Sequence, residues 1–334
     1  MKKLLYRWFI DGLSYMTLGL FSSLIIGLIM QTIGKQTLFP SLHLEFLVEV
    51  GKVAQSLTGA AIGAAIAYGL KGKPLVIFAA VIVGMLGYET FSGGAVGAFF
   101  AVLIAVELSQ LYAAKTKIDI IVTPLLTLMI GGLVAKFLGP VLSQLMLEIG
   151  KVIMISTDQQ PFVMGILVAV IFGLCLTAPI SSAALALMLD LSGLAAGAAT
   201  IGCACQMIGF AVTSYKENGV SGIISIGLGT SMLQVPNILL KPLIIVPPTL
   251  ASAIIAPIMT VLFPMTNNAA EGMGTSGLVG QIMTINTMGA SLNTWLLIMM
   301  FHFVLLAFVT FVIYRFMIKR QWLHVGEQKI QLNQ

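Results

Sequence analysis

The chain has 334 residues, of which 58% are hydrophobic and only 9% are charged. Soluble domains carry about a quarter charged residues, so this composition excludes an ordinary soluble enzyme and predicts an all-α polytopic membrane protein. The net charge of +5 does not indicate a nucleic-acid partner, because the basic residues stand in twos and threes at the ends of apolar runs.

Apolar runs in chain order predict about ten transmembrane helices within a single transmembrane domain, residues 1–334. These spans are expected near residues 13–33, 53–70, 74–90, 94–113, 119–138, 161–179, 182–199, 200–215, 243–263 and 293–316. Ten crossings put every basic cluster and both termini on the cytoplasmic side, as the positive-inside rule requires. The clusters are Lys2, Lys3 and Arg7; Lys71 and Lys73; Lys115 and Lys117; Lys216; and Arg315, Lys319 and Arg320.

Three segments outside these spans have patterns of their own. In residues 1–10, apolar and aromatic side chains alternate with basic ones, which predicts an interfacial helix. Residues 139–160 are expected on the outer side, with an amphipathic surface helix, and residues 319–334 form a cytoplasmic tail. Glycine pairs spaced by four predict close helix packing: Gly59 and Gly63, Gly93 and Gly97, Gly193 and Gly197.

Helix continuity is expected to fail first at residues 227–242. Pro236 and Pro242 remove backbone donors there, and the freed carbonyls need partners other than lipid. Gln234 and Asn237 stand at this break and can supply polar groups.

The second predicted break is residues 265–287, a tract rich in asparagine and glycine around Glu271. Irregular backbone at membrane depth survives only inside protein or beside a water-filled cavity, so two such breaks indicate a transport site. A helix is expected to restart at Thr275 or Ser276, with its first amides directed into that cavity. The alternative interpretation is a polar loop outside the membrane.

These two breaks predict a binding site for a small polar solute. Its expected residues are Glu271, Asn267, Asn268, Thr275 and Ser276, with Gln234 and Asn237 opposite. No catalytic residue, metal or cofactor is expected, and Cys175, Cys203 and Cys205 are interpreted as buried thiols without metal-ligand spacing.

Other ionisable residues in apolar runs are secondary candidates, because a charge at the bilayer centre is costly and normally faces the protein interior. Glu89 is expected either to line the site or to lie at the outer interface beside Tyr88. Asp190 is a candidate for proton or cation handling. His302 is interpreted first as a neutral imidazole that hydrogen-bonds to a neighbouring helix, and second as a proton relay. Glu107 is expected to reach the cytoplasmic boundary.

Four stretches of the sequence resemble a known family: residues 11–34 (DGLSYMTLGLFSSLIIGLIMQTIG), 59–70 (GAAIGAAIAYGL), 247–259 (PPTLASAIIAPIM) and above all 267–282 (NNAAEGMGTSGLVGQI). They are similar to phosphotransferase-system enzyme IIC, type 2, which includes perfringolysin-regulator-like membrane proteins. The resemblance implies a bacterial inner-membrane homodimer with a sugar-permease fold, in which re-entrant hairpins close a central site. In that system enzyme IIC carries a sugar while a IIB protein phosphorylates it.

The sequence also departs from the glucose-type members of that system. No region resembles a IIA or IIB domain, so separate IIA and IIB proteins are expected as phosphoryl donors. The GITE-type motif of the glucose branch is absent, and Glu271 is its nearest analogue in kind. Two other functions stay open: a proton-coupled secondary transporter that uses Glu271 or Asp190, and a membrane sensor that binds a ligand without moving it.

Overall fold

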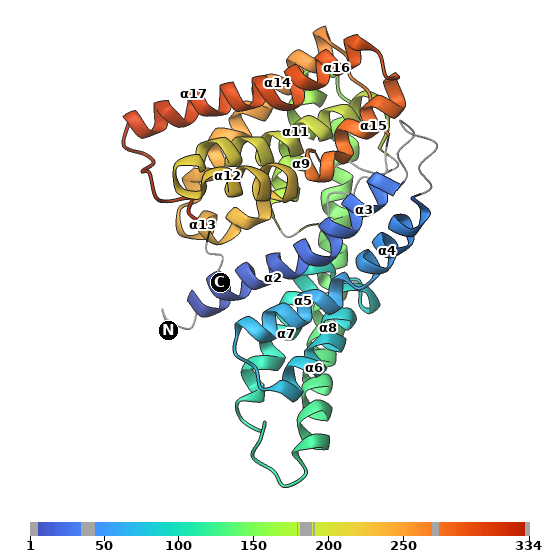
Figure 1. Cartoon of the computed structure of the whole chain (residues 1–334), viewed down its shortest axis with the longest axis vertical. Coiled ribbons are helices and arrows are strands. Elements are labelled where there is room, and N and C mark those ends of the chain that lie inside the picture. Colours follow the sequence, from blue (N-terminus) through green and yellow to red (C-terminus); the bar gives the residue numbers. More distant parts are fainter. Residues whose placement is uncertain are drawn as a thin grey trace. The chain divides into compact units, whose positions relative to one another are not determined.

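The computed structural model describes residues 6–34, 44–178, 180, 189, 191–268 and 274–330. These residues are largely helical, and their only β-type pairing is an isolated antiparallel bridge between Gly193 and Asn267. Within the same ranges, five helices are long and apolar enough to cross a bilayer, and a bent pair of helices makes a sixth. The chain is therefore an all-α integral membrane protein. It divides into two compact units (Figure 1).

The first unit contains residues 1–34 and 44–147. Its elements are η1 (Arg7–Gly12), α2 (Leu13–Leu20), η2 (Phe21–Ile25), α3 (Ile26–Gly34), α4 (Glu45–Ser56), α5 (Thr58–Gly69), α6 (Pro74–Met85), η3 (Leu86–Thr90), α7 (Gly94–Ser109) and most of α8 (Asp119–Thr157). The first four join into one helical stretch, Arg7–Gly34, so residues 7–10 continue directly into the first span. Helices α4 and α5 are bent by 56° at their junction.

Small residues set the packing of this unit. A Cβ added to Gly63 would collide with the carbonyl of Ala80, and one added to Gly84 would collide with the carbonyl of Gly59. The backbones of α5 and α6 therefore touch, which confirms the close packing predicted for the first glycine pair. Gly93 and Gly97 meet the carbonyl of Gly87 in the same way.

The second unit contains residues 35–43 and 148–334. Its elements are the end of α8, then α9 (Pro161–Thr177), α11 (Gly193–Thr213), α12 (Tyr215–Ile224), η4 (Ser225–Gly229), η5 (Ser231–Gln234), α13 (Val235–Leu240), η6 (Pro242–Ile245), α14 (Val246–Leu262), η8 (Ser276–Leu278), α15 (Val279–Met288), α16 (Leu292–Ile298), η9 (Met299–Val304) and α17 (Leu305–Lys319). Helix α11 is its core, packed against α9, α14 and α17. Gly197, in the third predicted pair, meets the carbonyl of Met265.

Two predicted boundaries are wrong. Residues 193–213 form the single helix α11, so no break separates the expected spans 182–199 and 200–215 at residue 199. Its 21 residues extend about 31 Å, one bilayer core, and no proline interrupts them. Residues 139–157 do not form a separate surface helix, because α8 continues through Pro140 for 39 residues.

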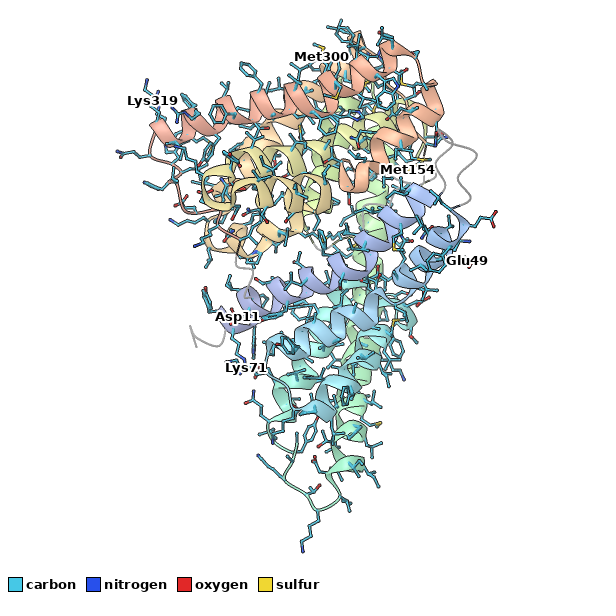
Figure 2. The ribbon with its side chains drawn as sticks, viewed as in Figure 1. Asp11, Glu49, Lys71, Met154, Met300 and Lys319 are labelled. Atoms are coloured by element: carbon cyan, nitrogen blue, oxygen red, sulfur yellow. The ribbon has the colours of Figure 1, made fainter. Side chains whose placement is uncertain are left out.

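Outward faces of the long helices carry large apolar side chains, as expected of surfaces in contact with lipid. Met154 on α8 and Met300 on η9 are each 43% exposed (Figure 2). Lys71 and Lys319, in contrast, stand at helix ends.

Candidate functional site

The first predicted break doubles back on itself, and we name residues 215–240 hairpin A. The side-chain amide of Asn218, on its first arm, donates to the carbonyl of Gln328 at 2.9 Å. Asn237, on its second arm, donates to the carbonyl of Lys329 at 3.0 Å. Both arms therefore end beside the same short piece of chain. The turn lies at Thr230, which is extended and whose hydroxyl accepts from the amide of Met232 at 3.2 Å.

Gln234 and Asn237 are brought together, but with the C-terminal tail (residues 320–330). Asn237 Nδ2 donates to Gln234 Oε1 at 2.8 Å, and Gln234 Nε2 donates to the carbonyl of Gln328 at 2.9 Å. No described hydrogen bond joins either residue to Asn267, Thr275 or Ser276. In this structure the amides of Gln234 and Asn237 bind the tail.

The second predicted break is closed by Asn267, which is 1% exposed, and we name residues 265–287 hairpin B. Asn267 Nδ2 lies 3.1 Å from the carbonyl of Gly280 and 3.3 Å from Thr284 Oγ1, both on the opposite arm. The same atom lies 3.0 Å from Thr200 Oγ1 on α11. The backbone amide of Asn267 donates to the carbonyl of Gly193 at 3.1 Å. One side chain thus joins both arms of hairpin B to the core helix.

The tips of the two hairpins meet. Thr275 Oγ1 donates to the carbonyl of Gly227 at 2.5 Å, and Ser276 Oγ donates to the carbonyl of Gly229 at 2.8 Å. All four residues are buried. The hydroxyls of hairpin B therefore satisfy carbonyls that the end of η4 leaves without helical partners. The two breaks predicted separately from sequence form one polar junction inside the second unit.

The predicted helix restart at Thr275 or Ser276 is confirmed only as the short 3-10 turn η8 (Ser276–Leu278), which has Thr275 at its N-cap position, and the predicted side-chain cap is wrong. Helix α15 begins at Val279, after Gly277 and Leu278 in left-handed conformations with φ of 54° and 60°. Neither hydroxyl caps α15, because both are committed to hairpin A. The prediction took the first threonine and serine before an apolar run as caps, and it had no information about their cross-hairpin partners.

The remaining predicted residues are dispersed. Glu271 and Asp190 lie outside the described residues. Asn268 is exposed, and its amide donates to Asn267 Oδ1 at 2.9 Å. His302 is 1% exposed and its Nδ1 lies 3.0 Å from Gln281 Nε2 on α15, the bond to a neighbouring helix that was predicted. Glu89 is exposed at the end of η3 in the first unit.

Four buried polar residues were missed by the sequence reasoning: Thr200 beside hairpin B, Gln281 and Thr284 within it, and Gln206 on α11, whose side chain donates to Thr249 on α14. All are buried, and the side-chain carbonyl oxygens of Gln206 and Gln281 have no partner among the described residues. Each glutamine is an isolated polar residue in an apolar run, a signal that could have identified both. Unpaired acceptors of this kind suit a solute that brings hydroxyl donors.

The comparison with known families agrees with this architecture. The model of the family described as phosphotransferase system, EIIC, matches residues 10–330, a range that includes both hairpins and the whole of the polar junction. No individual curated protein matches the chain. Because the family match covers nearly the whole sequence, the chain belongs to the phosphotransferase-system EIIC family of membrane permeases.

Proposed function

We propose that the protein is the permease component of a phosphotransferase system that moves a small sugar-like solute across the bacterial cytoplasmic membrane by alternating access. One observation carries this proposal: the tips of two doubled-back segments meet at Thr275 and Ser276 through buried hydrogen bonds. Discontinuous helices that meet at a polar junction are the usual construction of a transport site.

The solute site in this proposal is the polar junction of hairpins A and B. Asn267, Asn268, Thr275, Ser276 and Glu271 belong to hairpin B. Gln281 on α15 adds a buried carbonyl oxygen without a described partner, which supports a ligand rich in hydroxyl donors. Gln234 and Asn237 join the site only in a state in which the tail has left them.

The membrane topology in this proposal has ten crossings with both termini cytoplasmic. Within the described residues, five long helices, one bent pair and the shorter apolar helices Pro74–Thr90, Gly94–Ser109 and Pro161–Thr177 supply nine candidate crossings, so the tenth stays a prediction. The segment Ser231–Leu240 rises only about 15 Å, half of a bilayer core, so we propose that hairpin A enters and leaves from the tail side. Hairpin B then enters from the opposite side, and the protein forms a homodimer, as its family resemblance implies.

The proposal is tested most directly by Glu271→Gln, with Glu148→Gln as a matched control. Glu148 is exposed and pairs with Lys151 on the surface, so losing its charge removes little. We expect Glu271→Gln to reduce solute uptake at least tenfold while the protein still inserts, and Glu148→Gln to retain normal uptake. Equal uptake by both variants removes Glu271 from the site.

Uptake into membrane vesicles identifies the coupling. With separate IIA and IIB proteins and a phosphoryl donor present, we expect the solute to appear inside the vesicle as a phosphate ester. Accumulation of unmodified solute that collapses with a protonophore would instead identify a proton-coupled transporter. Absence of uptake for every sugar tested, together with altered transcription on gene deletion, would identify a sensor.

A further inference from the structure

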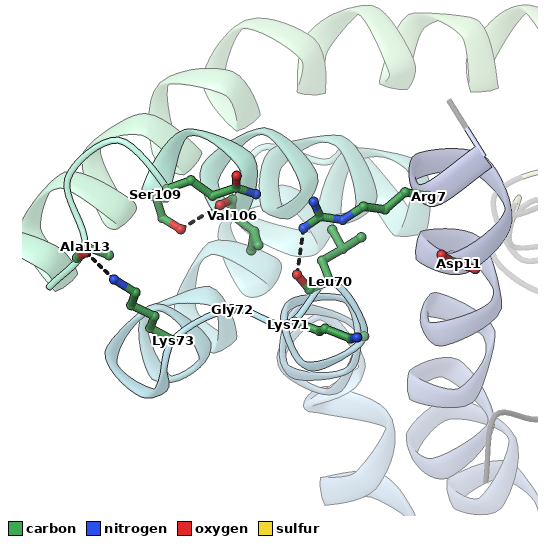
Figure 3. Close-up of a pocket in the computed structure, with 11 residues that line it drawn as sticks. Arg7, Asp11, Leu70, Lys71, Gly72, Lys73, Val106, Ser109 and Ala113 are labelled. Carbon is green, nitrogen blue, oxygen red and sulfur yellow. Dashed lines mark hydrogen bonds between the residues drawn. The ribbon is translucent and has the colours of Figure 1, made fainter. Parts of the chain in front are cut away.

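The first unit contains a pocket of about 440 Å³ that belongs to no part of the proposed solute site. It lies between η1, the turn that joins α5 to α6, and the C-terminal end of α7 (Figure 3). Three cationic side chains line it, from Arg7, Lys71 and Lys73, against one acidic side chain, from Asp11. The volume is within the usual range of small-molecule sites.

The cations are held in place by backbone carbonyls. Arg7 Nη2 donates to the carbonyl of Leu70 at 2.8 Å, and Lys73 Nζ donates to the carbonyl of Ala113 at 2.5 Å (Figure 3). Each contact uses one N–H donor, whereas a lysine ammonium has three and an arginine guanidinium has five, so further donors remain for a ligand. The backbone amide of Lys71 donates to the carbonyl of Tyr68 at 2.9 Å, but its side-chain ammonium has no hydrogen bond or ion pair to any described residue.

Nearby acidic groups do not neutralise this charge. Glu107 is paired with Arg7 at 3.3 Å and lies two residues before the C-terminal end of α7. The Arg7–Glu107 pair is neutral, and the two positive charges of Lys71 and Lys73 still exceed the single negative charge of Asp11. The turn also precedes the N-terminal end of α6, where the helix dipole favours negative charge.

The surroundings of the pocket are typical of the membrane–water interface. Tyr68 precedes the pocket residue Gly69, is 68% exposed and packs edge to face with Tyr15 at 6.2 Å. Exposed tyrosines next to lysines are characteristic of headgroup depth. The three cations also belong to the clusters expected on the cytoplasmic side.

We propose that this pocket binds a phosphate group, carried by an anionic lipid headgroup or by a soluble phosphate ester. The guanidinium of Arg7 presents a planar set of donors to phosphate oxygens, and the two ammonium groups add charge from the other side of the turn. Basic pockets between membrane helices on the cytoplasmic side are suited to this chemistry.

The test is a binding titration on the full-length protein purified in detergent. The probes are phosphatidylglycerol and phosphatidylcholine in mixed micelles, inorganic phosphate and glucose 6-phosphate. We expect saturable binding of at least one phosphate probe and weak binding of zwitterionic phosphatidylcholine. Lys71→Gln, which breaks no described contact, is expected to weaken that binding about fivefold. Lys117→Gln removes the same charge from an exposed loop outside the pocket and is expected to leave it unchanged.

A second variant distinguishes a direct effect on binding from a loss of folding. Asp11→Asn removes the one acidic group in the lining and is expected to tighten binding severalfold, which damage to the fold would not do. Preference for phosphatidylglycerol that inorganic phosphate does not displace identifies a lipid, and competition by inorganic phosphate or glucose 6-phosphate identifies a soluble ester. Equal effects of Lys71→Gln and Lys117→Gln, or no saturable binding of any probe, overturn the proposal.

Discussion

A single side chain, that of Asn267, joins three elements of the second unit. Its amide nitrogen lies within hydrogen-bond distance of Thr200 on α11 and of Gly280 and Thr284 on α15. Removal of a buried donor leaves its acceptors unpaired, and each unpaired buried group costs about 1–3 kcal/mol. Asn267 therefore holds hairpin B closed as well as contributing to the proposed site.

We predict that Asn267→Ala destabilises the protein by about 1–3 kcal/mol and strongly reduces solute uptake. Asn286→Ala is the matched control, because Asn286 is an exposed asparagine on α15. The only described hydrogen bond of its side chain goes to the sulfur of Met283. Thermal unfolding in detergent measures the first effect and vesicle uptake the second. An unchanged unfolding temperature in Asn267→Ala would contradict the role of Asn267 as a clamp.

At this scale the sequence predicted that buried amides and hydroxyls at the two breaks need partners, but it could not predict which ones. The pairing of Thr275 with Gly227 spans 48 residues, and that of Gln234 with Gln328 spans 94. Such partners depend on how separate helices pack, and no local pattern encodes them. Gln234 and Asn237 were therefore predicted to bind the solute, and their hydrogen bonds to the tail were not predicted.

Among the elements, the C-terminal tail clamps hairpin A through polar contacts. Besides the bonds from Asn218, Gln234 and Asn237, Thr213 Oγ1 donates to Gln328 Oε1 at 2.7 Å, and Glu327 pairs with Lys241 at 3.3 Å. Partial burial raises the pKa of Glu327, but hydrogen bonds from the His324 amide and from Lys241 outweigh it and lower the pKa below its usual value. The ionised carboxylate is thus the form that stabilises the docked tail.

The pH dependence of the tail follows from this direction. Because the pKa of Glu327 is lower when the tail is docked, its contribution to docking is fully present above the usual carboxyl pKa and is lost as the pH falls through the lowered pKa of the docked state. We predict that Glu327→Gln speeds amide hydrogen exchange at residues 324–330 roughly two- to fivefold at pH 7. The difference from wild type should shrink at acidic pH. A difference in exchange rate between the variant and wild type that grows on acidification would contradict the prediction.

Helix boundaries were predicted less well than helix content. In α11, glycine, alanine, threonine and cysteine residues gave no clear start or stop signal, so the expected spans 182–199 and 200–215 do not match the helix. In α8, the expected span ended at residue 138, but the helix continues through Pro140 to Thr157. Proline removes one backbone donor but does not end a helix when neighbouring turns remain bonded. Close packing was predicted correctly for the first two glycine pairs and for Gly197, because a glycine lets a neighbouring backbone approach, but a Cβ on Gly193 would meet no atom within 4 Å.

For the whole molecule, α8 provides a test of the proposed topology. Its 39 residues extend about 58 Å, nearly twice the hydrocarbon core, so its two ends should reach opposite sides of the membrane. Residues at those ends, Lys117 and Gln159, are exposed.

We predict that a cysteine at Gln159 reacts with a membrane-impermeant maleimide in intact cells, whereas one at Lys117 reacts only after permeabilisation. The background replaces Cys175, Cys203 and Cys205, all buried, by alanine. Labelling of both positions from outside would contradict the cytoplasmic placement of the basic clusters. Labelling of neither would contradict the single crossing by α8.

The clamp between hairpin A and the tail has a consequence for biosynthesis. Asn218 leaves the ribosome 110 residues before Gln328, its partner. In the nascent protein, the side-chain amides of hairpin A therefore lack their tail carbonyl partners until translation has nearly finished. A purification tag fused directly after residue 330, or a premature stop before residue 324, would act on the last step of maturation and leave the earlier helices free to insert.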